Sequence, residues 1–187
     1  VYRTNEEYLR EAISSILAQT YSDFEFLILD DCPEDDRELI VKSYKDRRIK
    51  YLRNETNMGI SESRNKLVDM ARGEYLAVMD HDDVSLPERL EKQVNYLDAH
   101  PDVGVVGCWT DVFPDNKGLY FPSDDFKIKS LMMNICAVVH PSSMLRKSVL
   151  IENKIRYEKE YSPAEDYKLW CSLMEFTRFY NISEVLF

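Results

Sequence analysis

Apolar positions along the chain follow two spacings, one typical of amphipathic helices and one typical of buried strands. Residues 5–19 place apolar side chains at helical spacing, and Thr4 with Glu7 has the pattern of a capping box at the start of that helix. The apolar run 24–29 then has the length and composition of a buried strand. Helix-like and strand-like segments continue to alternate in this way as far as Trp109.

The remaining segments extend this alternation over the whole chain. Helices are predicted near 39–44, 61–72, 87–97, 126–133 and 164–176, and strand-like segments at 49–52, 75–79, 103–109 and 138–145. Gly73 suits a C-terminal helix cap, and 113–125 is a polar loop. Strands joined by single helices predict an α/β fold with a mainly parallel central sheet and helices on both faces. Without a repeat or linker, residues 1–187 are predicted to form one domain.

Composition and charge narrow the function. The chain has 34 acidic and 24 basic residues, and this net charge of -10 argues against nucleic-acid binding, which needs basic patches. No apolar run reaches the ~18 residues of a transmembrane helix, and no signal peptide is visible. The scattered cysteines favour free thiols in a reducing compartment over a zinc site or disulfide framework. They are Cys32, Cys108, Cys136 and Cys171.

Two acidic clusters follow predicted strands, Asp30-Asp31 and the run Asp80–Asp83. Ligands of parallel α/β sheets bind at the carboxyl ends of the strands, so both clusters are expected at one edge. Three carboxylates within four residues repel one another, and Mg²⁺ or Mn²⁺ bound together with a diphosphate would relieve that repulsion. Capping of the following helix by Asp83 or Ser85 is the alternative interpretation.

Four stretches in this order resemble glycosyltransferase family 2, a family of inverting enzymes with the GT-A fold, which is Rossmann-like. The stretches are 14–25, Asp30-Asp31, 57–65 and 73–90, and the likeness continues through 136–144 to 164–167. Each stretch is modest alone, but their order and spacing together are specific. The resemblance implies a single GT-A catalytic domain whose first strand begins before Val1 and which is also truncated at its C-terminus.

The resemblance assigns roles on the donor side of the site. It implies that Tyr2 lies against the nucleotide base, that Asp31 accepts from the uracil ring and that Arg64 reaches the nucleotide or its phosphates. It further implies that Asp82 ligates Mn²⁺ or Mg²⁺, while Asp80 contacts the ribose or the metal. From the residues alone, the first acidic pair equally fits a turn, and a lone arginine is more often a solvated helix charge.

On the acceptor side, the resemblance implies that Asp166 is the catalytic base. In a single displacement the acceptor hydroxyl needs a carboxylate to take its proton. From spacing alone, an acid at a helix N-terminus is more simply a capping group. The resemblance also places His140 and Glu165 near the acceptor, although a lone histidine is more often structural. The absence of a Gln-x-x-Arg-Trp sequence argues against a processive synthase.

The function implied is a metal-dependent inverting glycosyltransferase acting in bacterial cell-surface polysaccharide synthesis. It would move a sugar from a nucleotide-sugar donor, with a UDP-sugar favoured, to a saccharide or lipid-linked saccharide. The expected location is the cytoplasm, with the inner face of the membrane as an alternative. Three rival interpretations are a response-regulator receiver domain, a sugar nucleotidyltransferase and a non-catalytic nucleotide-sugar binder. A helix before the acidic pair argues against the first rival, and the lack of glycine before Gly59 argues against the second.

Overall fold

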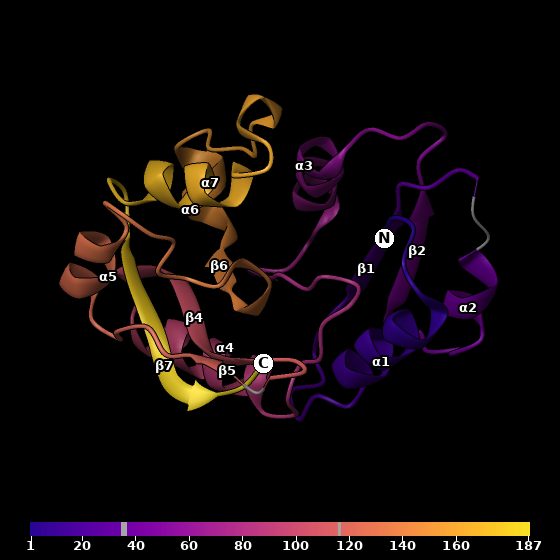
Figure 1. Cartoon of the computed structure of the whole chain (residues 1–187), viewed down its shortest axis with the longest axis horizontal. Coiled ribbons are helices and arrows are strands. Elements are labelled where there is room, and N and C mark those ends of the chain that lie inside the picture. Colours follow the sequence, from indigo (N-terminus) through magenta and orange to yellow (C-terminus); the bar gives the residue numbers. More distant parts are fainter. Residues whose placement is uncertain (35–36, 116) are drawn as a thin grey trace.

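The computed structural model describes residues 1–34, 37–115 and 117–187, and its elements fall into an N-terminal and a C-terminal group (Figure 1). Asn116, inside the predicted loop 113–125, lies outside the described residues. The N-terminal group consists of α1 (Glu6–Leu17), β1 (Phe26–Asp30), α2 (Glu38–Lys42), β2 (Ile49–Arg53) and α3 (Ile60–Met70). The C-terminal group consists of β3 (Tyr75–Ala77), α4 (Arg89–Ala99), β4 (Val103–Val112), β5 (Lys117–Leu119), α5 (Asp125–Leu131), η1 (His140–Ser142), β6 (Met144–Arg146), α6 (Lys147–Glu152), η2 (Lys159–Tyr161), α7 (Glu165–Leu173) and β7 (Arg178–Val185).

In the N-terminal group, β1 and β2 pair in parallel, with Phe26 opposite Ile49. The apolar face of α1 packs on this pair, and its buried residues share one core with residues of β1 and α2. Asn5, rather than the Thr4 of the predicted capping box, caps α1, since its side-chain oxygen accepts from the Glu7 amide at 2.8 Å. Both residue types cap well, so spacing alone misplaced the cap by one residue.

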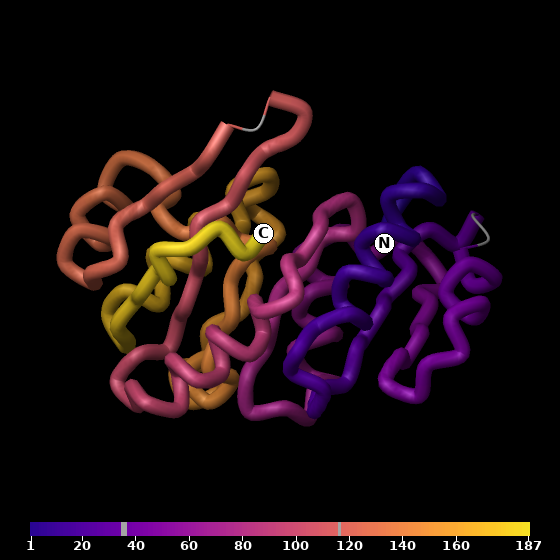
Figure 2. The backbone as a smooth tube through the Cα atoms, turned by 90° about the horizontal axis from the view of Figure 1, so that it is seen from below, coloured from indigo at the N-terminus to yellow at the C-terminus, as the bar shows by residue number. Residues whose placement is uncertain are grey.

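The C-terminal sheet is mixed, so the predicted mainly parallel sheet is wrong for this half of the chain. Strand β4 pairs in parallel with β7 but antiparallel with β5 and β6, and β6 pairs antiparallel with β3. The β4–β5 connection is a short hairpin that extends from the body (Figure 2), and parallel neighbours would need a longer crossover.

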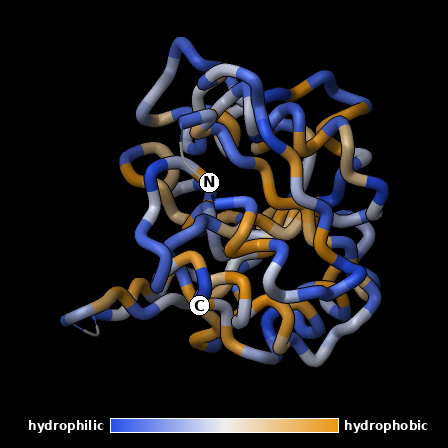
Figure 3. Tube along the Cα trace, turned by 90° about the vertical axis from the view of Figure 1, so that its right-hand side faces the viewer, coloured by the Kyte–Doolittle hydropathy of each residue, from blue (hydrophilic) through white to orange (hydrophobic). Residues whose placement is uncertain are grey.

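Helices cover both faces of the C-terminal sheet, as predicted. Successive residues of a strand point to opposite faces, and Val105 and Val106 of β4 accordingly belong to different cores. Val105 packs in the core that contains Trp170 of α7, whereas Val106 packs in the core that contains Leu97 of α4. Figure 3 shows hydrophobic stretches running through the interior of the trace.

Several local predictions differ from the structure. Helix α3 ends at Met70 with Ala71 as its C-terminal cap, so Gly73 does not cap it. His140 starts a short 3-10 helix instead of lying in a strand. The predictions also missed β5, α6 and β7. All four cysteines are free thiols, and none of the helices in the described ranges is both long and apolar enough to cross a membrane.

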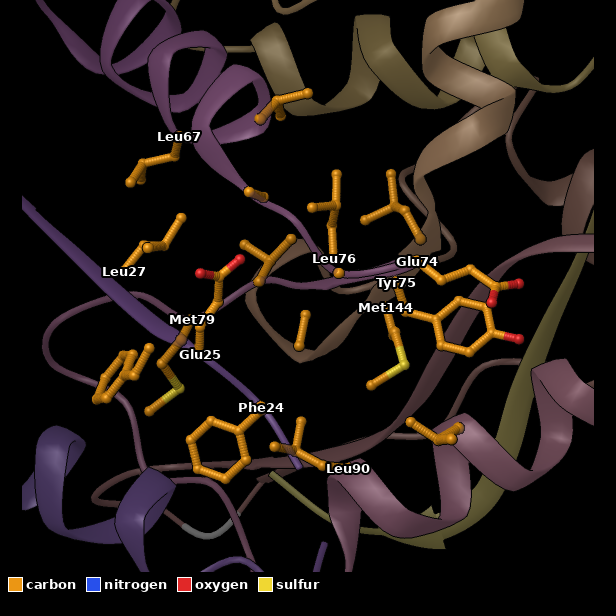
Figure 4. A pocket seen from close by; sticks show the side chains of 18 of the residues that line it. Phe24, Glu25, Leu27, Leu67, Glu74, Tyr75, Leu76, Met79, Leu90 and Met144 are labelled. Atoms are coloured by element: carbon orange, nitrogen blue, oxygen red, sulfur yellow. The ribbon is translucent and has the colours of Figure 1, made fainter. Parts of the chain in front are cut away.

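An apolar groove lies between β1 and β3, two strands that do not pair in the described part of the chain. Figure 4 shows this groove, a cavity of 840 Å³ lined by residues such as Leu27, Leu67, Leu76 and Met144. Val1 pairs with the exposed edge of β1, since its amino group donates to the Leu29 carbonyl and its own carbonyl accepts from the Asp31 amide.

Candidate active site

The two acidic clusters line one cleft. Asp31 follows the last residue of β1, and Asp80 follows the end of β3. A cleft of 580 Å³ is lined by both clusters and by the N-terminal end of α3. The structure thereby brings together the residues predicted for the donor side: Tyr2, Asp31, Arg64, Asp80 and Asp82.

Asp31 anchors the loop that leads into α3. Its Oδ1 atom accepts from the Asn54 side-chain amide and from the Met58 backbone amide, both at 2.8 Å. Its Oδ2 atom accepts from the Gly59 amide at 2.9 Å. Gly59 has φ 82, a conformation that glycine adopts without a side-chain clash. An ionised carboxylate offers about four acceptor positions, so Asp31 keeps one for a ligand.

The neighbouring Asp30 is a structural group. It is fully buried, and its two oxygens accept from the Cys32 amide at 3.0 Å and the Tyr51 hydroxyl at 2.7 Å. Burial and this hydrogen bond raise the pKa of Tyr51 above its ordinary value. Asp30 therefore holds β1 to β2, while its neighbour Asp31 faces the cleft.

Arg64 bridges the two sides of the site. Its Nη2 atom donates to Asp80 Oδ1 at 3.0 Å, and its Nη1 atom lies 3.4 Å from Glu165 Oε1 on α7. The guanidinium also sits over the ring of the buried Tyr157, 5.6 Å from its centroid. With 15% of its side chain exposed, Arg64 is not the solvated helix charge of the alternative interpretation.

The acidic run carries excess negative charge. Burial, followed by the nearby Asp80 and Asp82, raises the pKa of Asp83 to about 6. Burial likewise lowers the pKa of His81, whose Nδ1 atom lies 3.6 Å from Asp82 Oδ1. The capping alternative is wrong, because α4 begins after Glu88 and no side chain caps it.

The residues of this run fit a divalent cation that is shared with a substrate. No three Asp, Glu, His or Cys side chains of the described ranges converge into a ready-made metal site. Mg²⁺, however, is commonly held by one or two carboxylates, with substrate phosphates and waters completing its shell. Burial is the larger cause of the raised pKa of Asp83, and the carboxylates of Asp80 and Asp82 add the negative charge that such a cation would offset. Asp80 and Asp82 are the residues that would hold it.

Asp166 and Glu165 start α7 on the opposite side of Arg64. Asp166 is half-buried, and its Oδ1 atom accepts from the Tyr167 amide at 2.7 Å, which leaves its other oxygen available. Glu165 is only 5% exposed, and its Oε2 atom is buried without a hydrogen-bond partner among the described residues. Such an orphaned carboxylate oxygen is costly unless a ligand or a water pairs with it.

His140, at the start of η1, is buried beside Tyr157 and Trp170. Its Nε2 atom is 2.9 Å from the Tyr157 hydroxyl, and it packs against the Trp170 ring. Burial, together with the nearby Arg64, places the pKa of His140 well below its ordinary value. Its Nδ1 atom is buried and lacks a described partner. His140 is therefore a buried group held between Tyr157 and Trp170, and its place near the acceptor stays a prediction.

Two of the residues that organise this site were missed by the sequence analysis. Tyr157 exchanges two backbone hydrogen bonds with the Asn65 side chain, at 2.9 and 3.0 Å, and so ties its loop to α3. Asn65 belongs to the stretch 57–65 that carried a resemblance, which was a usable signal. Tyr157 stands in a segment without periodicity, so nothing in the sequence marked it.

The family profile and the relatives that match this chain indicate the same protein family. A profile described as "Glycosyl transferase family 2" matches residues 1–154. An uncharacterized glycosyltransferase of Methanocaldococcus jannaschii is 38% identical over 90% of this chain and 60% of its own length. The O-antigen biosynthesis glycosyltransferase WbnJ of Escherichia coli is 34% identical over 97% of this chain and 73% of its own. The chain spans about 60% of the length of several curated relatives.

Solved structures share the fold. S. aureus TarS in complex with UDP-GlcNAc superposes with a TM-score of 0.80 and 23% identity, covering 99% of this chain and 55% of TarS. The mannosyltransferase PcManGT of Pyrobaculum calidifontis, in complex with GDP-Man and Mn²⁺, superposes with a TM-score of 0.71 and 16% identity, covering 99% and 52%. At these identities the likeness concerns the fold.

Proposed function

Since this chain belongs to glycosyl transferase family 2, we propose that it is a metal-dependent inverting glycosyltransferase using a nucleotide-sugar donor. The family predicted from the sequence is confirmed, and membership sets aside the receiver-domain and nucleotidyltransferase alternatives. We further propose a UDP-sugar as donor and surface polysaccharide synthesis as the context. The proteins that support these choices are TarS, solved with UDP-GlcNAc, and WbnJ, named for O-antigen biosynthesis.

The observation that carries this proposal is the position of Arg64, which lines the cleft, between Asp80 of the cleft and Glu165 at the start of α7. Asp80, on the proposed donor side, and Glu165, beside the proposed base, lie 3.0 and 3.4 Å from one guanidinium. A diphosphate bound beside Asp80 would place its negative charge next to Arg64, and arginine recognises phosphate oxygens through its planar fork of N–H groups. The donor and the acceptor would then meet at this point.

On the donor side, each residue has a proposed task. Tyr2 is 42% exposed at the cleft and would lie against the base. Asp31 would use its one remaining acceptor position for a ring N–H of uracil. Asp80 and Asp82 would hold Mn²⁺ or Mg²⁺ with the diphosphate, and this cation would offset the charge that develops on the leaving group.

On the acceptor side, Asp166 is the proposed catalytic base. Its free carboxylate oxygen would take the proton of an acceptor hydroxyl while that oxygen forms the new bond to C1 of the sugar. The bond from C1 to the diphosphate oxygen breaks in the same step, so the configuration at C1 inverts. Glu165 Oε2 and His140 Nδ1, both buried without a described partner, would pair with the acceptor or with ordered water. A saccharide or lipid-linked saccharide is the proposed acceptor.

Calorimetry with UDP tests the donor half of this proposal. The native chain should bind UDP only when Mn²⁺ or Mg²⁺ is present, and Asp82→Ala should abolish that binding. Asp23→Ala is a matched control, because this exposed aspartate precedes β1, at the end of the strand opposite Asp31. Metal-independent binding of equal strength would contradict the metal assignment.

A cytoplasmic location, with the inner membrane face as the alternative, also stays a proposal.

A further inference from the structure

Arg89, the first residue of α4, is a fully buried cation that has no ion-pair partner in the described part of the chain. None of its side-chain area is exposed, and no carboxylate lies within 4.0 Å of its guanidinium among the described residues. Burial lowers its pKa to about 10. Burial of a charge without an opposite charge beside it is destabilising unless hydrogen bonds satisfy the charged group.

The Arg89 guanidinium joins two separate stretches of backbone. Its Nη2 atom donates to the Val78 carbonyl at 2.7 Å, and its Nη1 atom donates to the Pro141 carbonyl at 3.0 Å. Val78 lies just beyond the end of β3 and leads into the acidic run. Pro141 belongs to the 3-10 helix that begins with His140. One side chain therefore holds the backbone that leads into the acidic run Asp80–Asp83 against the turn that contains His140.

These contacts close a ring beneath the cleft. From Val78 the chain reaches Asp80, which accepts from Arg64, and Arg64 sits over Tyr157. The Tyr157 hydroxyl then contacts His140, whose neighbour Pro141 returns to Arg89. The far end of the acidic loop is fixed separately, because the Gln19 side chain donates to the Leu86 carbonyl at 2.8 Å and accepts from the Leu90 amide at 3.0 Å. A change in the position of the Arg89 side chain would therefore move both the acidic loop and the turn that contains His140.

We propose that Arg89 is a positioning residue that fixes the loop bearing Asp80 and Asp82 relative to the turn bearing His140. The expected effect of Arg89 on donor binding rests on the proposed function. Its expected effect on the position of the two backbone segments does not. Without these two hydrogen bonds, the backbone hydrogen bond from the Val78 amide to the Ser143 carbonyl still links the two segments, but the acidic loop and the turn are held less firmly against each other. The carboxylates then lose their fixed place beside Arg64, and even small displacements of binding groups weaken binding steeply.

Arg146 provides a matched control at the other end of β3. It lies opposite Tyr75 in the β3–β6 pairing, and its side chain is 14% exposed. Its guanidinium also binds a backbone carbonyl, since the Nη2 atom of Arg146 donates to the Leu97 carbonyl at 2.8 Å. Arg146 therefore also holds backbone with a largely buried guanidinium, but it pairs with Glu74 at 3.0 Å, unlike Arg89, and it lies away from the cleft. A general loss of stability should follow from changing either arginine, whereas a positioning effect should follow only from changing Arg89.

Hydrogen exchange measures the structural part without reference to activity. The Val78 amide donates to the Ser143 carbonyl, and the Ser143 amide donates to the His140 carbonyl, so both amides report on the clamped region. Arg89→Lys and Arg89→Met should speed exchange at these two amides by about tenfold or more relative to the amides of β4. Arg146→Met should instead affect the Lys147 amide, which donates to the Glu74 carbonyl. Uniform exchange changes in the Arg89 variants would overturn the proposal.

Calorimetry with UDP and Mn²⁺ measures the functional part. At a temperature where each variant is folded, Arg89→Lys should weaken UDP binding by about tenfold, because an ammonium replaces the fork that reaches both carbonyls. Arg146→Lys should bind like the native chain. Native-like binding by Arg89→Lys would overturn the positioning role. If the native chain itself binds no UDP with either metal, the proposed function fails, and the exchange experiment still decides the structural claim.

Discussion

The Arg64 guanidinium donates to the Asp80 carboxylate at 3.0 Å and thereby joins α3 to the acidic loop. The arginine side chain is 15% exposed and the aspartate side chain 38% exposed, so solvent screens this pair less than it screens a surface ion pair. The same guanidinium contacts Glu165, which makes it a shared cation for two carboxylates of different segments. Its planar shape is what allows both contacts at once.

Replacement of Arg64 by lysine separates the effect of its positive charge from the effect of its planar shape. Arg64→Lys keeps the positive charge but offers one donor centre, so it should retain only one of the two carboxylate contacts. We expect UDP affinity with Mn²⁺ to fall by about tenfold and the free energy of unfolding to fall by roughly 1 kcal/mol. Calorimetry and urea unfolding measure the two effects. Arg10→Lys, at an exposed ion pair with Glu6, should change neither, and an unchanged affinity in Arg64→Lys would contradict the bridging role.

Asp166→Asn tests the proposed base. The amide cannot take a proton, so transfer should slow by about 10²–10⁴-fold, while UDP binding with Mn²⁺ should stay native-like. Release of UDP in the presence of donor and acceptor measures transfer, and calorimetry measures binding. Glu160→Gln, an exposed carboxylate in the nearby η2 segment, is the control and should transfer normally. Full activity in Asp166→Asn would remove this residue from the mechanism.

Asp31→Asn tests the anchor of the α3 entry loop. If the asparagine keeps the position of the native side chain, its one oxygen can still accept, but its amide nitrogen would face an N–H donor from Met58 or Gly59. We expect a loss of roughly 1–3 kcal/mol in the free energy of unfolding, measured in urea, since a buried donor is left unpaired. UDP affinity should fall as well. An unchanged stability would show that the loop does not depend on this carboxylate.

The elements that could be predicted from the sequence are those whose signal is local. The helical spacing of α1 and the apolar run of β1 each contain enough residues to define their period, whereas the acidic pair after β1 equally fits a turn until the fold places Asp31 in the cleft. The acidic run Asp80–Asp83 is a stronger local signal. Its crowding of carboxylates needs no knowledge of distant residues.

Features that depend on distant partners could not be predicted. Strand β7 contains the buried polar residue Asn181, which fits because its amide donates to the carbonyls of Pro122 and Ala137. Arg89 resembles a surface charge in the sequence, and only the fold shows the two carbonyls that it holds. Antiparallel pairing of β6 was likewise invisible, because strand direction is set by the path of the chain between strands.

His140 makes the stability of the fold depend on pH in a definite direction. In the unfolded chain a histidine has an ordinary pKa of 6.5, whereas burial and then Arg64 lower the pKa of His140 well below this value in the folded state. Below pH 6.5 the unfolded state therefore binds a proton that the folded state does not. The stability due to neutral His140 is complete above that pH and is lost on acidification, by at most about 1.4 kcal/mol per pH unit.

Comparison of the native chain with His140→Gln isolates this effect. Glutamine does not titrate and can still pair with the Tyr157 hydroxyl, so the difference between the two free energies of unfolding removes the contribution of all other groups. That difference should shrink as the pH falls from about 7 to about 5.5, because only the native chain carries the histidine. Urea unfolding at several pH values measures it. His100→Gln, at an exposed ring on the surface, is the matched control and should keep the native pH dependence. A difference that stays constant over this range would mean that His140 is protonated in the folded state, next to Arg64, which its burial argues against.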